Sequence, residues 1–195
     1  MNRAVTNTLI YRVIYFFTGS LITLSIPFTL SLEEQGLYFT FASVLTVQVF
    51  FELGLSQVLQ IKFANLSSSF HTDENNKFVN SYKENKKVRK LLLIGRIYYR
   101  ILSTLFFIFT VIIGFVFFRE FKDSSVPVLA IWTILVFITS LNLLNNIKLT
   151  FIEGIGKIDI VSRIRLFGNL FGFIVFFTFS FLGFGFWIVI TIPLA

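Results

Sequence analysis

The sequence predicts an all-α polytopic membrane protein, a bundle of five full transmembrane helices followed by the start of a sixth. Of its 195 residues, 55% are hydrophobic and only 14% are charged, whereas a soluble domain carries about 25% charged residues. The apolar residues form runs of about 20, the length of a helix that crosses a bilayer core of about 30 Å. The formal charge of +7 lies between these runs, which favours basic membrane-surface loops over a nucleic-acid-binding domain.

Six apolar segments are expected to be helical. The first is too long for a signal-peptide core, so we expect it to be a retained span. The last has ten residues, too few to cross a membrane, and we expect the chain to be a fragment of a longer protein. In chain order the segments cover residues 9–30, 37–61, 91–118, 127–149, 166–182 and 186–195.

Polar or turn-forming residues separate these segments. The acidic stretch 31–36, the short stretch 119–125 and the polar stretch 153–165 are expected to be connectors, and residues 65–90 the single long loop. Pro127 is expected to open the fourth helix, and Gly183 and Gly185 predict a tight turn.

The basic residues predict the orientation, because lysine and arginine concentrate in cytoplasmic loops. With the N-terminus inside, 15 of the 17 basic residues fall on the inner side, and only Arg119 and Lys122 fall outside. The inner residues are Arg3, Arg12, Lys62, Lys77, Lys83, Lys86, Lys87, Arg89, Lys90, Arg96, Arg100, Lys148, Lys157, Arg163 and Arg165. A cytoplasmic N-terminus is therefore expected.

Several apolar segments carry one polar stripe each, at spacings of three, four or seven that place residues on one helical face. Charges inside a span cost about 2.5–3.5 kcal/mol each on insertion scales, so they usually face a cavity or a partner. Two interpretations stay open. The polar residues either form interhelical hydrogen bonds that hold the bundle together or line a water-filled cationic cavity. Arg12 and Arg96 are the charges most suited to reach the membrane surface instead. The stripes comprise Gln48, Glu52, Ser56 and Gln60; Arg89, Arg96 and Arg100; Thr139, Asn142, Asn145 and Asn146; and Arg165 and Asn169.

The two charges Glu52 and Arg100 are expected to lie at the same depth. Each stands nine residues from the inner end of its span, about 14 Å at 1.5 Å per residue. Since the two helices run antiparallel, we expect an ion pair that offsets the desolvation of both groups. If they do not pair, Glu52 is available as a proton- or cation-coupling carboxylate facing the cavity.

No catalytic or metal-binding constellation can be assembled from this sequence, so an enzyme is not expected and no cofactor is implied. Gly154 and Gly156 precede Lys157, but the next residue is Ile158, whereas a phosphate loop needs serine or threonine there. His71 is the only histidine of the chain, and zinc sites need further ligands at defined spacing.

Five stretches resemble the Wzx-type O-antigen and polysaccharide flippases of the MOP (MATE-like) superfamily. LEEQGLYFTF at residues 32–41 followed by FFELGLS at residues 50–56 is similar to the first outer loop and second helix of that family. RIYYR at residues 96–100 is similar to its third helix, and FIEGIGK at residues 151–157 with RIRL at residues 163–166 to its connector between helices four and five.

The resemblance implies that residues 1–195 form the N-terminal lobe of a two-lobed transporter whose C-terminal lobe is absent. Family members move oligosaccharides linked to undecaprenyl diphosphate across the bacterial inner membrane. The partners implied are this lipid-linked oligosaccharide, membrane lipids and a second lobe or glycan polymerase machinery, and no nucleic acid. Arginines suit a diphosphate because guanidinium binds phosphate oxygens bidentately. The candidate cavity residues are Arg96, Arg100, Arg12, Arg165, Gln48, Glu52 and Asn142.

Three alternatives remain. A multidrug exporter of the same superfamily is expected to have a more apolar and acidic cavity. A glycan polymerase or acyltransferase needs a long outer loop, and the expected outer loops are short. An inactive truncated membrane scaffold is the third.

Overall fold

The computed structural model describes residues 3–52, 54–67, 71–72, 78–79, 82–119 and 127–194. The parts of the expected connectors at residues 68–70, 73–77, 80–81 and 120–126 lie outside the described residues. The elements are α1 (Arg3–Thr29), α2 (Leu32–Leu45), α3 (Gln48–Glu52), α4 (Leu55–Ser67), β1 (His71–Thr72), β2 (Phe78–Val79), α5 (Tyr82–Phe118), α6 (Val128–Gly154), α7 (Ile158–Phe181) and the 3₁₀ helix η2 (Gly185–Leu194).

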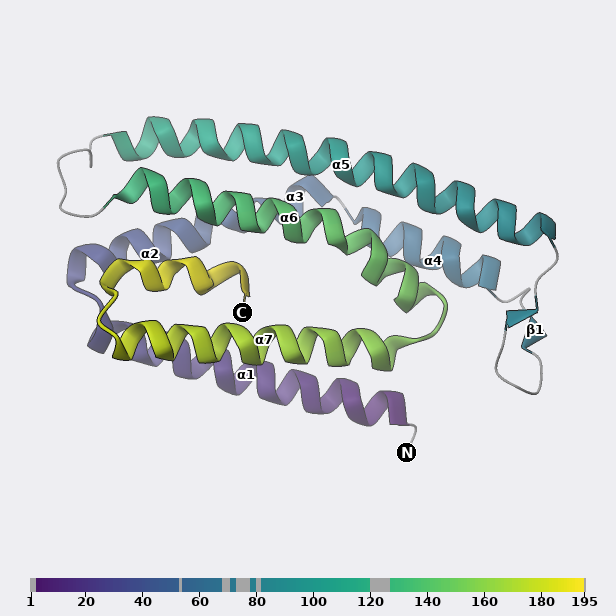
Figure 1. The fold of residues 1–195 in the computed structure, drawn as a ribbon, viewed down its shortest axis with the longest axis horizontal. Coiled ribbons are helices and arrows are strands. Elements are labelled where there is room, and N and C mark those ends of the chain that lie inside the picture. Colours follow the sequence, from purple (N-terminus) through teal and green to yellow (C-terminus); the bar gives the residue numbers. More distant parts are fainter. Residues whose placement is uncertain are drawn as a thin grey trace.

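The helices pack as two long pairs with shorter elements between them. α5 packs along α6, and α1 packs along α7, and Figure 1 shows the two pairs as separate layers. α4 packs on α6, and η2 contacts both α6 and α7. α6 therefore contacts α5, α4 and η2 and lies at the centre of the fold.

The chain is a multi-pass helical membrane protein, but the expectation of five full spans and the start of a sixth is wrong. Four described helices, α1, α5, α6 and α7, are long and apolar enough to cross a membrane. The expected second span, residues 37–61, is divided into α2, α3 and α4, with a bend of 43° between Leu32–Glu52 and Leu55–Leu66. Gly54 lies in this bend with φ of 71°, a left-handed conformation that ends a regular helix at little cost only for glycine.

The segment expected to open a sixth α-helix is also different. Residues Gly185–Leu194 form a 3₁₀ helix. Five consecutive residues in it, 188–192, are isoleucine, valine or threonine, and β-branched side chains lose rotamer freedom in an α-helix.

The ends of the expected connectors are helical in the structure. α5 begins at Tyr82 and α4 continues to Ser67, so the described part of the loop expected at 65–90 is reduced to the antiparallel pair β1–β2. The expected connector 153–165 shrinks to a turn at residues 155–157, and residues 32–36 form the first turns of α2 behind a capping box of Ser31 and Glu34. These segments are rich in lysine, arginine and glutamate, which are good helix formers. The change from apolar to polar residues therefore indicates where a helix leaves the membrane, not where the helix ends. The expected helix start at Pro127 and the turn at Gly183 and Gly185 are confirmed.

An aromatic cluster forms the main core where α2, α5, α6 and η2 meet. Phe41 lies 4.8 Å from both Phe118 and Trp132, measured between ring centroids, and 5.6 Å from Phe186. The Trp132 indole N–H donates to the Thr110 carbonyl at 3.1 Å. These rings fix the end of the bundle where α5 ends and α6 begins.

Candidate functional site

A cavity of about 580 Å³ lies between α1, the end of α2, α3, α6 and η2. Polar and apolar groups share the wall about equally, and none of its lining residues is charged. The polar groups are amides, hydroxyls and phenols. The lining residues are Tyr11, Tyr15, Ala42, Leu45, Thr46, Gln48, Val49, Thr139, Asn142, Asn146 and Ile192. Such a wall can offer many hydrogen bonds to a neutral ligand.

Helical spacing accounts for the polar side of this wall. Thr139, Asn142 and Asn146 follow one another on α6 at intervals of three and four, which places them on one face. Tyr11 and Tyr15 are four apart on α1, and their ring centroids lie 5.8 Å apart. The polar stripe recognised in the sequence thus meets two aromatic rings from another helix.

Gln48 reaches the cavity because the second apolar segment is not one straight helix. α2 ends at Leu45, and Thr46 donates from its hydroxyl to the Ser43 carbonyl at 2.5 Å. The chain then turns and resumes as α3. Thr46 and Gln48 therefore both face the cavity, although they are only two residues apart.

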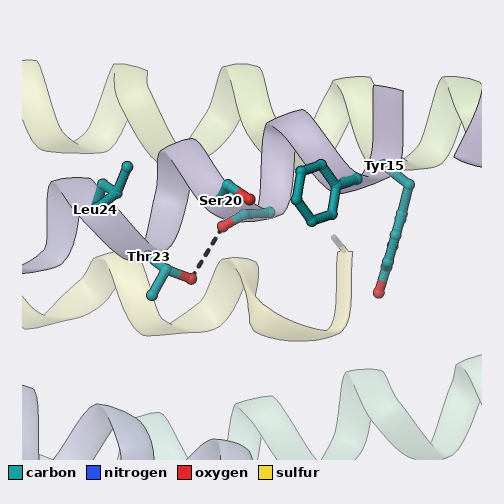
Figure 2. Close-up of a pocket in the computed structure, with 6 residues that line it drawn as sticks. Tyr15, Ser20, Thr23 and Leu24 are labelled. Atoms are coloured by element: carbon teal, nitrogen blue, oxygen red, sulfur yellow. Dashed lines mark hydrogen bonds between the residues drawn. The ribbon is translucent and has the colours of Figure 1, made fainter. Parts of the chain in front are cut away.

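A second, shallow cavity of about 550 Å³ is open at the surface of α1 and is lined by residues of that helix alone. Figure 2 shows Tyr15, Ser20, Thr23 and Leu24 around it, with the Thr23 hydroxyl donating to the Gly19 carbonyl at 2.9 Å. Tyr15 lines both cavities, so the two meet at this residue, but the second is mainly apolar.

A chain of hydrogen bonds lies directly behind the first cavity. Asn146, which lines the cavity, donates from its amide to one carboxylate oxygen of Glu52. Ser56 donates to the other carboxylate oxygen at 3.0 Å, and its hydroxyl lies 2.6 Å from the Tyr99 hydroxyl. Thr150 also forms a hydrogen bond with Tyr99. The chain connects α3, α4, α5 and α6 across the bend at Gly54.

The expected ion pair between Glu52 and Arg100 is wrong. In the described part of the chain Glu52 contacts Asn146 and Ser56 and forms no ion pair, and the Arg100 side chain is exposed. Tyr99, which is fully buried, occupies the position on α5 that faces α4. Successive residues of a helix are rotated by about 100°, so Arg100 points away from α4.

The other candidate residues fall into three groups. Gln48 and Asn142 line the cavity as expected. Arg12, Arg96 and Arg100 are exposed and line neither cavity, so these arginines do not give the cavity a cationic wall. Arg165 pairs with Glu153 at 2.8 Å, which joins α7 to the end of α6.

Sequence reasoning missed Tyr11, Tyr15 and Tyr99. Tyrosine inside an apolar run also suits the membrane–water interface, so its presence alone did not indicate a cavity. The usable signal was the spacing of four between Tyr11 and Tyr15, in a segment that carries Thr8 and Thr18 near the same face.

Comparisons with protein-family models, curated proteins and solved structures gave no match.

Proposed function

We propose that the chain forms one lobe of a transporter that moves undecaprenyl-diphosphate-linked oligosaccharide from the inner to the outer leaflet of a bacterial plasma membrane. In this proposal the N-terminus is cytoplasmic. The observation that carries it is an open, uncharged cavity in which apolar helices present amide, hydroxyl and phenol groups. A hydrophilic glycan that crosses hydrocarbon needs such hydrogen-bonding groups to replace its lost water.

The chemistry of the wall suits sugar rings. Amide groups of Gln48, Asn142 and Asn146 both donate and accept hydrogen bonds, as sugar hydroxyls require. The rings of Tyr11 and Tyr15 offer flat apolar faces for the C–H side of a sugar and carry a polar hydroxyl at one end. The volume of about 580 Å³ lies within the 300–1,000 Å³ common for small-molecule sites.

The diphosphate role of Arg96 and Arg100 is a separate prediction, because neither arginine lines the cavity. Arg100→Ala is expected to weaken glycan export at an unchanged protein level. Arg100→Lys should restore part of it, since a point charge cannot reproduce bidentate phosphate binding. Full export by Arg100→Ala would remove the arginine from the proposal and leave the glycan cavity in place.

Photo-crosslinking in native membranes tests glycan binding by the chain. The probe is a polyprenyl-diphosphate-linked oligosaccharide with a diazirine on its sugar. We expect crosslinks in the peptides that contain Tyr11, Tyr15 or Asn142, and about tenfold less labelling in Asn142→Leu. Asn145→Leu is the matched control, because Asn145 is exposed on the same helix, does not line the cavity and bonds the Leu141 carbonyl. Equal labelling of both variants, or labelling only of exposed faces, would contradict the proposal.

One observation favours the alternative of an organic-cation exporter. Glu52 lies one side chain behind the cavity wall, in contact with Asn146, and a carboxylate attracts a cation. In the same membranes, tetraphenylphosphonium should then compete with the glycan probe for wild type but not for Glu52→Gln. For a glycan site, tetraphenylphosphonium should not displace the probe from either protein.

A further inference from the structure

The first turns of α5 extend beyond the apolar part of the helix. α5 has 37 residues, about 55 Å at 1.5 Å per residue, whereas a bilayer core is about 30 Å thick. Figure 1 shows α5 reaching past the end of α6 where it begins. Its exposed basic residues Lys86, Lys87, Arg89 and Lys90 precede the apolar run that starts at Leu91, so a continuous helix holds them at the level of lipid headgroups.

The three lysines share one side of α5 with exposed aliphatic residues. Seven residues along an α-helix fall only about 20° short of two full turns. Lys86, Lys87 and Lys90 are each followed, seven residues later, by an aliphatic side chain. These are Leu93, Ile94 and Ile97, which are 57%, 52% and 50% exposed.

The opposite side of α5 faces the bundle. Gly95, Tyr99, Leu102, Ser103 and Phe106 are buried there, and Ser103 bonds Ser140 of α6. The lysines therefore do not face the cavity or the neighbouring helices. The lysines lie two turns N-terminal to Leu93, Ile94 and Ile97, side chains that a surrounding lipid would cover.

We propose that this face of α5 is a binding site for an anionic phospholipid of the adjacent leaflet. The lysine ammonium groups contact the phosphate and headgroup, and the acyl chain lies along Leu93, Ile94 and Ile97. Each lysine near an anionic headgroup contributes about five-fold in affinity. A zwitterionic lipid offers no net charge to this cluster, so the site selects lipids by headgroup charge.

The aliphatic residues are what favour a lipid over a soluble polyanion. Other exposed basic residues occupy the same end of the bundle on other elements, among them Lys62 on α4, Lys148 on α6 and Lys157 in the turn before α7. A soluble polyanion would be attracted by the whole basic end. A lipid requires the charged cluster and the apolar stripe on one helix face, which α5 provides.

The test uses the purified full chain reconstituted in phosphatidylcholine with trace spin-labelled phosphatidylglycerol or spin-labelled phosphatidylcholine. Electron paramagnetic resonance measures the motionally restricted fraction of each. We expect phosphatidylglycerol to be preferred at least about five-fold. The preference should weaken between about 0.1 M and 1 M salt, as the Debye length falls from ~10 to ~3 Å.

Two triple variants separate the α5 face from the general charge of this end. Replacement of Lys86, Lys87 and Lys90 by glutamine should reduce the preference below about two-fold. Replacement of Lys62, Lys148 and Lys157 by glutamine removes the same charge and should leave the preference within about two-fold of wild type. Equal losses in both triples, or no preference in wild type, would overturn the proposal. If the first triple does not fold, as judged by circular dichroism, Lys90→Gln alone should still lower the preference at least about two-fold.

Discussion

The hydrogen bond between Glu52 and Asn146 can be tested by double-mutant analysis. The same analysis tests whether Glu52 instead pairs with Arg100, as the sequence had led us to expect. Asn146 donates to Glu52 across the break between α3 and α4, and the two residues share this bond. Hydrogen bonds to charged groups contribute about 1.5–3 kcal/mol. Glu52→Ala and Asn146→Ala should therefore each lower the free energy of unfolding in detergent by about that amount. The double variant should lose less than the sum, with a coupling energy of about 0.5–3 kcal/mol.

Glu52 and Arg100 form the matched control cycle. Arg100 is exposed and shares no described contact with Glu52, so Glu52→Ala and Arg100→Ala should be additive within about 0.5 kcal/mol. The assay is thermal unfolding of the purified chain, in which 1 kcal/mol corresponds to roughly 2–4 °C for a chain of this size. Additive effects in the Glu52–Asn146 cycle, or clear coupling in the Glu52–Arg100 cycle, would refute the reasoning.

The remaining predictions concern packing and orientation. Gly114→Ala should lower the free energy of unfolding by about 1–3 kcal/mol, because the added methyl group overlaps the buried Trp132 indole and overpacking costs that much. At Gly168 nothing lies within 4 Å of the added atom, so Gly168→Ala should be neutral or stabilising by up to about 1 kcal/mol. Thermal unfolding of both variants measures this difference, and an equal loss of stability in the two would contradict it. Because the chain has no cysteine, Lys157→Cys should resist a membrane-impermeant thiol reagent in intact cells while Glu33→Cys reacts; the reverse pattern would place the N-terminus outside.

Where the sequence prediction of the fold failed, the same physical cause recurs. Hydropathy locates the apolar part of a helix, because burial in lipid is what it measures. It does not locate the helix end when good helix formers continue past the membrane surface, as at Tyr82–Lys90 and Ile158–Arg165. The break at Gly54 was missed for a related reason, since the residues on both sides are apolar and one left-handed glycine leaves no mark in a hydropathy profile.

The candidate site was predicted in part. Gln48 and Asn142 line the cavity as expected, whereas the pairing of Glu52 with Arg100 was expected only from counting residues along each helix. Which residue faces a neighbour depends on rotation about the helix axis, and an error of one residue, about 100°, exchanges Tyr99 for Arg100. The polar stripe on α6 was recognised because three of its members share one face. Tyr11 and Tyr15 of α1 were not recognised, because the sequence alone does not show that α1 lies opposite that stripe.

The structure also distinguishes the two interpretations of the polar stripes. Some polar residues hold helices together with both partners buried: Thr18 donates to Asn169 at 2.7 Å between α1 and α7, and Ser103 bonds Ser140 between α5 and α6. Gln48 and Asn142 instead line the cavity.

Asn146 belongs to both groups, because it lines the cavity and also binds Glu52 at the break between α3 and α4. Non-helical backbone at membrane depth is tolerated only where it is buried in protein or lines a water-filled cavity. A broken second span therefore requires polar surroundings, and the polar cavity on one side and the hydrogen-bond chain on the other supply them. The break, the cavity and the half-buried carboxylate of Glu52 are thus parts of one arrangement, and a substitution that straightens this span should remove all three together.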